Sequence, residues 1–174
     1  MRRKWVWALV AVGLGAVLYG GIALATPPQG VSNPINVHGT FEGIDAMAKT
    51  DIDPGTATDF WQVRVEAKGA TDLYVLENVI APGGTFGWHS HPGPSLVIVK
   101  AGTLSVYQGP DCAPQDFGPG SALGSTFTDQ GHDVHMVRNN STTDVADVYV
   151  VSFVPAGFQR RINEDNPNPS VCPN

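Results

Sequence analysis

Short stretches in which apolar and polar residues alternate dominate the chain after residue 60. Residues 61–66 alternate strictly, with Trp61, Val63 and Val65 on one side, as in a half-buried strand. Further strands are predicted at residues 73–81, 85–91, 96–100, 103–108, 134–138 and 145–154. Gly- and Pro-rich turns separate them, including one at residues 82–84, and no long helical period or internal repeat interrupts the pattern. Strands spaced about 8–12 residues apart predict an all-β sandwich or barrel.

The segments outside this region have weaker patterns. Residues 26–36 are Pro-rich and predict an extended arm. Residues 39–50 suit either a strand or one helical face, and the strand is favoured, whereas residues 51–59 predict a loop. The turn-rich section before residue 134 holds Phe127 as an isolated apolar residue. The predicted organisation is an arm with the first strand or strands at 26–59, a barrel at 60–155 and a Pro/Asn-rich tail at 156–174.

Residues 1–25 differ in composition from the rest of the chain. Arg2, Arg3 and Lys4 precede a long uncharged apolar run, which ends at Ala23-Leu24-Ala25. A basic start, an apolar stretch and a small-x-small site predict a secretory signal peptide. The run exceeds the roughly 7–15 residues of a signal core and approaches the roughly 20 that span a bilayer, so an uncleaved N-terminal anchor is the alternative. Both predict export of residues 26–174, secreted or anchored.

The charge of the remaining chain excludes several classes of partner. Without the three basic residues of the N-terminus, Lys+Arg falls from 10 to 7 against 16 Asp+Glu, and the net charge moves from −6 to −9. An acidic chain without a basic cluster is poorly suited to nucleic acid or to an anionic membrane surface. Membrane contact is therefore expected only through residues 1–25, if they remain attached.

The two cysteines, Cys112 and Cys172, agree with export. An oxidising compartment favours a disulfide between them, which would tie the tail at residues 163–174 back onto the body. The alternative is two unrelated thiols. A redox or metal role is disfavoured because neither lies in a C-x-x-C pair or beside a histidine.

The histidines are the best candidates for chemistry. His89 and His91 lie two apart on a predicted strand, so their imidazoles point to the same side, as adjacent metal ligands do. His135, beside a later strand, would be the third ligand. His132 would be an additional ligand or pocket group if the turn redirects it, since it otherwise lies on the opposite face, and His38 belongs to neither group.

The surroundings of these histidines resemble the two motifs of the cupin superfamily. In the first motif (Gly, five residues, H-x-H, three or four residues, Glu, six residues, Gly), Ser95 occupies the Glu position. In the second (Gly, five residues, Pro, one residue, Gly, two residues, His, three residues, Asn), Gln130 occupies the Pro position and His132 the second Gly. Seven positions agree at fixed separations within residues 60–155: Gly83, His89, His91, Gly102, Gly124, His135 and Asn139.

This resemblance implies a double-layered antiparallel β-barrel that binds one divalent metal ion through His89, His91 and His135. Ser95 and Asn139 would be further polar groups of the pocket, whereas Phe86 and Trp88 would point the other way. Without the Glu, three neutral imidazoles leave the ion's charge unneutralised and a coordination position open, which favours a small anionic guest. Imidazole suits Zn, Fe, Ni and Cu, and the missing carboxylate disfavours Mn.

The remaining candidates leave the activity open. Asp116, Asp129 and Asp133 have no evident partner in the sequence and are interpreted as an acidic surface. An enzyme of the oxygenase or isomerase type, a non-catalytic module that binds a small molecule or metal, and a structural barrel without metal are three hypotheses. The retained histidines favour the first two over the third. The oligomeric state, a dimer included, is not predicted.

Overall fold

The computed structural model describes residues 26–51 and 60–174, and the predicted export segment at 1–25 lies outside them. The described part contains no helix and consists of strands joined by turns. Its strands are β1 (Gln29–Phe41), β2 (Ile44–Asp51), β3 (Phe60–Ala67), β4 (Thr71–Ser90), β5 (Ser95–Ala101), β6 (Leu104–Gln108), β7 (Gln115–Phe117), β8 (Thr126–Asp129), β9 (His135–Arg138), β10 (Ala146–Pro155) and β11 (Ile162–Asn163). Over the same residues, no helix is long and apolar enough to cross a membrane.

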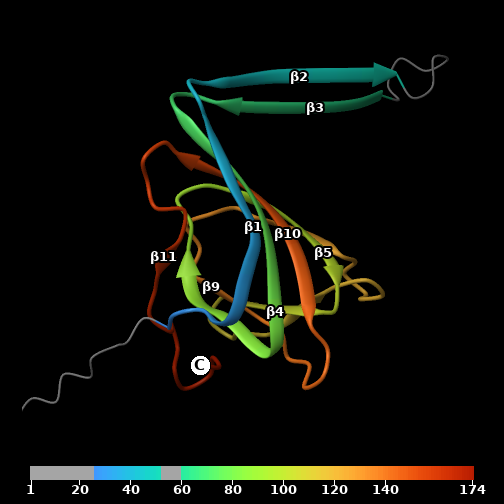
Figure 1. Ribbon diagram of the computed structural model, residues 1–174, viewed down its shortest axis with the longest axis vertical. Coiled ribbons are helices and arrows are strands. Elements are labelled where there is room, and N and C mark those ends of the chain that lie inside the picture. The colour runs from blue at the N-terminus through green and yellow to red at the C-terminus, as the bar shows by residue number, and fades with distance from the viewer. Residues whose placement is uncertain (1–25, 52–59) are drawn as a thin grey trace, which may run out of the picture.

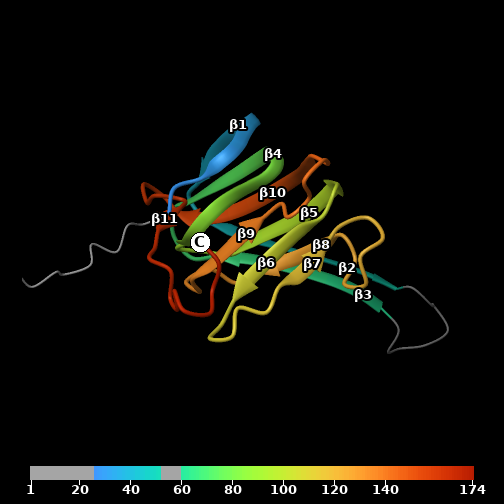
Figure 2. The same cartoon turned by 90° about the horizontal axis from the view of Figure 1, so that it is seen from below.

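Nine of these strands form one antiparallel sheet that curls into a barrel (Figures 1 and 2). Its order is β7-β6-β9-β4-β10-β5-β8, and β1 and β11 also pair with β4. The first half of β4 pairs with β1 and β10, while its second half pairs with β9 and β11. The sheet is thereby folded into two layers that share β4. The predicted all-β, double-layered antiparallel barrel is confirmed.

Strand β4 differs from the prediction, which placed two strands and a turn at residues 82–84. The chain instead continues as one strand of 20 residues from Thr71 to Ser90. It changes pairing partners near Pro82 and carries a register shift between Thr85 and Trp88, opposite β9. Gly and Pro at this point therefore mark the passage from one layer to the other, and the predicted turn is wrong.

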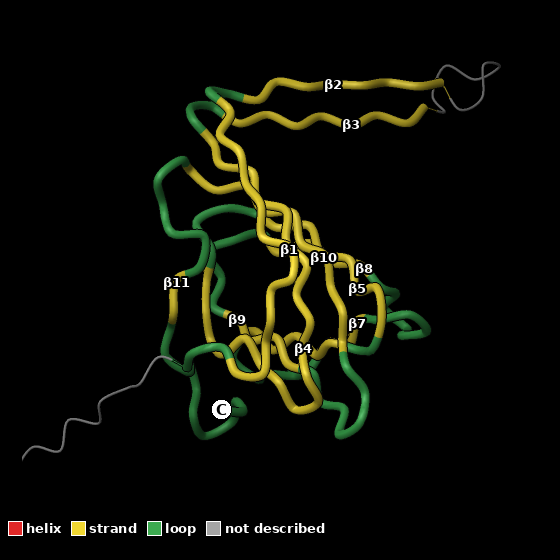
Figure 3. The backbone as a smooth tube through the Cα atoms, in the orientation of Figure 1, coloured by secondary structure: helices red, strands yellow, loops and turns green. Residues whose placement is uncertain are grey.

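Strand β1 belongs to the barrel sheet, and its first half lies in the segment predicted as an extended arm. It runs antiparallel to β4, with Phe41 opposite Thr71 at the end of the register. The chain between β1 and β4 forms β2 and β3, a separate two-stranded sheet that we call the hairpin. The hairpin projects away from the barrel (Figures 1 and 3). The alternating pattern correctly predicts β3 as a strand. The prediction that one face of this strand is buried is wrong, because Trp61 and Val63 are 51% and 40% exposed.

The barrel is filled by one apolar cluster and covered by a second. The interior cluster includes Ile80, Leu104 and Val148, each almost fully buried. The second cluster packs Trp88 and Met136 against a disulfide between Cys112 and Cys172. The Trp88 indole Nε1 donates a hydrogen bond of 3.0 Å to the Pro173 carbonyl. The C-terminal segment is thus fastened to the body, and the predicted disulfide is present.

Candidate metal centre

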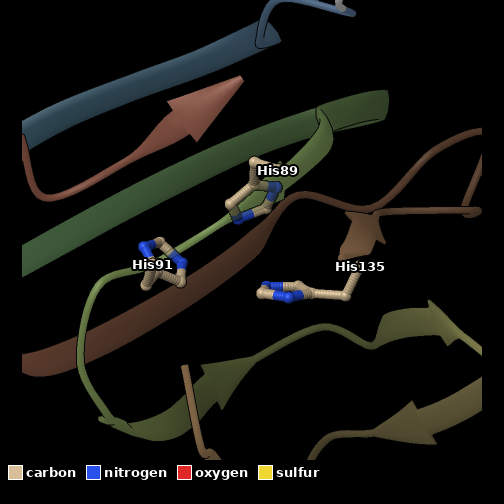
Figure 4. Close-up of side chains that lie close together, drawn as sticks. All are labelled: His89, His91 and His135. Atoms are coloured by element: carbon tan, nitrogen blue, oxygen red, sulfur yellow. The ribbon is translucent and has the colours of Figure 1, made fainter. Parts of the chain in front are cut away.

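Three histidines meet inside the barrel, at the ends of two paired strands. His89 lies at the end of β4, directly opposite His135 at the start of β9, and His91 follows β4 immediately. Their rings point toward one another (Figure 4), with centroids 4.3 to 5.4 Å apart. One nitrogen of each ring lies within 4.8 Å of the others, and all three residues are buried. The structure brings together the three histidines that the sequence predicts as ligands.

Gly87 sets the direction of these side chains. Its φ of +68° is a conformation that side chains rarely adopt, and a Cβ there would lie 1.9 Å from the Thr26 carbonyl oxygen. The resulting irregularity in β4 breaks the simple alternation of faces. Phe86 therefore lines the same cavity as His89, so the prediction that it points away is wrong. Trp88 does lie on the other side, in the cluster with the disulfide.

Backbone carbonyls hold all three imidazoles in one orientation. The Nδ1 atoms of His89, His91 and His135 lie 2.7, 2.7 and 2.9 Å from the carbonyl oxygens of Gly87, Arg160 and Asp133. A carbonyl can only accept, so each Nδ1 carries the hydrogen and donates it. Each Nε2 then keeps its lone pair. Such a second hydrogen bond is typical of metal-ligating histidines, because it fixes the tautomer and the ring orientation.

The electrostatic environment keeps two of these rings neutral. Burial lowers the pKa of His89 well below its usual value of 6.5, and the neighbouring His135 and His91 lower it further. Burial lowers the pKa of His91 to about 4, against the opposing effects of the Arg160 carbonyl and Asp129. Neutral imidazoles are the form that binds a metal ion, so this environment suits ligation at neutral pH.

The histidines open onto a cavity of about 60 Å³. At about 10–15 Å³ per water on this measure, it admits a few water molecules or a small ligand. Most of its wall is apolar, including Phe86, Val97 and Phe127. Two cations also line it, Arg160 and Arg161, and burial lowers the pKa of both, that of Arg161 to about 10. The cavity therefore combines an apolar wall with groups that attract an anion.

The sequence interpretation missed these arginines because they lie in the predicted tail. The β11 segment brings them back to β4, where an Nη2 hydrogen of Arg161 is donated to the Phe86 carbonyl. The Arg161 Nε is buried, and no described residue accepts its hydrogen bond. A signal was present, since Arg160-Arg161 is the one adjacent pair of basic residues in the sequence after residue 25.

Asp129 also lines the cavity, so its interpretation as an acidic surface residue is wrong. Its side chain is 10% exposed, and Oδ2 lies 3.6 Å from His91 Nε2. The error follows from a missed strand: residues 126–129 form β8, where Phe127 faces Val97 of β5. Four residues do not show a period clearly, whereas pairing with β5 places the carboxylate inside the barrel.

The other candidate residues lie near the centre without joining the histidine cluster. Ser95 lines the cavity, and its hydroxyl lies 2.8 Å from that of Ser152. His132 is exposed, with φ +61°, and its backbone N–H donates to the His91 carbonyl, so the turn does not redirect its ring into the cluster. Asn139 is fully buried outside the cavity lining and donates to the carbonyls of Ile80, Ala81 and Asp144. His38 stacks on Tyr74.

No protein-family model and no curated protein matches the chain. Among solved structures, a protein with a double-stranded β-helix domain from Klebsiella pneumoniae is 17% identical over 54% of this chain and 71% of its own, with a TM-score of 0.43. A cupin domain from Bordetella pertussis is 24% identical over 47% and 80%, with a TM-score of 0.38. The polyketide cyclase RemF from Streptomyces resistomycificus is 15% identical over 56% and 64%, with a TM-score of 0.43.

Cupin-domain proteins are thus among the solved structures to which this chain is similar. The similarity concerns general architecture, and no residue role is carried over from these proteins. The chain's own geometry defines an antiparallel β-barrel protein with a buried three-histidine site that could hold a metal ion.

Proposed function

We propose that this chain is an exported cupin that binds one divalent transition metal ion through His89, His91 and His135 and accepts a small anionic molecule beside it. The observation that carries the proposal is the common orientation of the three rings. Each donates from Nδ1 to a backbone carbonyl, so three Nε2 lone pairs are left within one buried cluster. Three imidazole lone pairs that converge on one point are the donor set that a divalent cation binds, and a shared ion would engage all three at once.

The donor set fits such an ion. Three imidazoles suit Zn, Fe, Ni or Cu, and a site with three protein nitrogens leaves a position open for a water or a guest. A divalent ion bound there supplies a Lewis acid for a substrate oxygen, or on iron or copper a centre for oxygen chemistry. The protein's own contribution is to fix the rings, exclude bulk water and position the guest.

The two arginines support an anionic guest. Arg160 and Arg161 line the cavity, and a carboxylate or enolate between them and the metal ion would meet positive charge on both sides. The apolar wall formed by Phe86, Val97 and Phe127 weakens competition from water and strengthens these interactions. The small cavity favours a guest of few heavy atoms, and an oxygenase or isomerase reaction on such a molecule is the activity we propose.

Export is the remaining part of the proposal. The signal-like segment at residues 1–25 and the disulfide between Cys112 and Cys172 both support it. Mass spectrometry of the protein from its natural host tests this part. A mature chain that begins near Thr26 would indicate cleavage, and an intact N-terminus in the membrane fraction would indicate an anchor. Recovery of the full-length chain from the cytoplasm would contradict export.

The metal site is tested by elemental analysis after reconstitution of residues 26–174. Wild type is compared with His89→Ala and His135→Ala, and His132→Ala serves as the matched control because its ring is exposed outside the cluster. We expect about one ion per chain in wild type and in the control, and less than about a tenth of that in the two ligand variants. Equal metal content in wild type and His89→Ala would refute the site.

The activity is tested on the metal-loaded protein with a panel of small carboxylates, phenols, thiols and β-dicarbonyls, by oxygen uptake and by proton exchange into deuterated water. Turnover that disappears in His135→Ala supports the enzyme. Saturable binding of a carboxylate without turnover of any compound would instead support the alternative, a non-catalytic binding module of the cell exterior.

A further inference from the structure

The carboxylate missing from the first motif has a counterpart on the neighbouring strand. Ser95, which occupies the Glu position of the cupin motif, is paired with Asp129 in the antiparallel register of β5 and β8. Residues directly opposite in such a pair project from the same face, with Cβ atoms about 4.5–5.5 Å apart. Asp129 therefore enters the barrel beside the position from which a Glu at residue 95 would enter.

The carboxylate of Asp129 is held in a defined orientation. Its Oδ1 accepts a hydrogen bond of 2.9 Å from the Gly131 backbone N–H. Gly131 has a φ of +79°, and a Cβ there would lie 2.7 Å from the Gly93 carbonyl oxygen, so the tight turn after β8 requires glycine. This turn leaves the second oxygen, Oδ2, directed toward His91.

Oδ2 has no hydrogen-bond partner among the described residues, although it is buried. Within the same residues, the one basic side chain closer than 4.0 Å is His91, whose Nε2 lies at 3.6 Å. Because His91 donates from Nδ1 to Arg160, the Nε2 atom presents a lone pair to a carboxylate oxygen. Two electron-rich atoms facing each other in a buried site repel, unless a cation lies between them.

The separation of the two atoms fits a shared ion. Donor atoms that are each about 2.1 Å from one tetrahedral ion lie about 3.4 Å apart, close to the observed separation. Ser95 offers a neutral hydroxyl that is hydrogen-bonded to Ser152 of β10, so the Asp129 carboxylate is the stronger ligand of the two.

We infer that Asp129 is a fourth protein ligand of the metal ion, and that β8 thereby supplies the carboxylate that β5 lacks. The inference rests on the metal site proposed above. It changes the expected chemistry of that site in two ways: the ligands carry one negative charge, and a carboxylate oxygen removes the reason for which Mn was disfavoured. Arg160 and Arg161 still favour an anionic guest.

Metal affinity, measured by competition with a chelator for Co²⁺ and Zn²⁺, tests the inference. Asp129→Asn removes the charge with little change in shape, and Asp111→Asn is the matched control, since Asp111 is exposed and lies outside the cavity lining. Asp129→Asn should weaken binding by at least the roughly 10–100-fold lost with an outer-sphere partner, whereas Asp111→Asn should stay within about threefold.

Binding by Asp129→Asn within threefold of wild type would overturn the inference while leaving the three-histidine site intact. Failure of wild type to bind any metal, with no difference from His89→Ala, would instead refute the proposed function itself. A crystal structure of the wild-type protein with Co²⁺ gives the direct answer even if the variant does not fold. The Asp129 oxygen should lie about 2.0–2.2 Å from the ion, and a distance beyond about 3 Å would exclude ligation.

Discussion

The barrel and the β2–β3 hairpin are made of similar alternating strands, but only the barrel buries them. Trp88 in β4 is fully buried, whereas Trp61 in β3 is 51% exposed. Val99 in β5 is 1% exposed, whereas Val63 in β3 is 40% exposed. The difference lies in the number of neighbours, because the hairpin is a two-stranded sheet and the barrel sheet has nine strands folded into two layers. Alternation assigns side chains to faces, and tertiary pairing decides whether a face is covered.

The largest expected effect on the free energy of unfolding comes from removing the disulfide that fastens the C-terminal segment to the barrel. Replacing both Cys112 and Cys172 by Ala should lower the free energy of unfolding by about 4 kcal/mol, because the disulfide closes a long loop in the unfolded chain. Urea unfolding of this variant beside wild type measures the loss. A loss below about 1 kcal/mol would show that the residues around Trp88 hold without the covalent link.

Matched truncations in the two regions test the comparison directly. Leu104→Ala inside the barrel should lower the free energy of unfolding by about 2–5 kcal/mol, since the side chain is fully buried and leaves a cavity. Met47→Ala on the hairpin, where the side chain is 66% exposed, should change it by less than about 0.5 kcal/mol. Equal losses in urea unfolding would mean that the hairpin face is covered in solution.

The barrel should also be the acid-sensitive region of the metal-free protein. The unfolded chain takes up protons at His91 below its usual pKa of 6.5, but the folded chain does so only near 4, so stability is complete above pH 6.5 and falls as the pH drops toward 4. Between pH 7 and 5 this amounts to about 2 kcal/mol for that residue. Urea unfolding across this range should show the loss, and His91→Gln should flatten it. An unchanged slope in His91→Gln would contradict this assignment.

A smaller effect is expected from removing one arginine from the barrel and, in a separate variant, one arginine from the hairpin. Arg161→Ala should weaken binding of malonate to the metal-loaded protein by about tenfold, because a buried charge-assisted contact is lost. Arg64→Ala on the hairpin removes the same charge at a residue paired with Glu66 and should leave binding within twofold. Isothermal titration measures both, and equal weakening would indicate a general charge effect.

The smallest effect is expected from removing the hairpin. Phe41 and Thr71 are paired in register, so an Asn-Gly turn in place of residues 42–70 would join β1 to β4 directly. Metal affinity should stay within about twofold, because no residue of the hairpin lines the cavity. Loss of metal binding in a folded variant would show that the barrel depends on the hairpin.

The sequence was sufficient for the features that depend on local spacing. Alternation and turns predict the all-β barrel, and H-x-H with His135 at a fixed distance predicts the histidine cluster. What the sequence did not predict depends on partners distant along the chain. The unbroken β4 follows from a change of partners at Pro82, Asp129 enters the barrel through pairing of β8 with β5, and the arginines return through β11.

The shared strand β4 also determines when the centre can form during synthesis. Its partners β9, β10 and β11 all come from the last 40 residues of the chain, and the carbonyl that orients His91 belongs to Arg160. An emerging chain therefore presents His89 and His91 before three of the four partners of β4 exist, with the second half of this apolar strand unpaired and prone to aggregate. The site can therefore form only after β9 and β11 have been synthesised, and a bound metal ion would enter after that point.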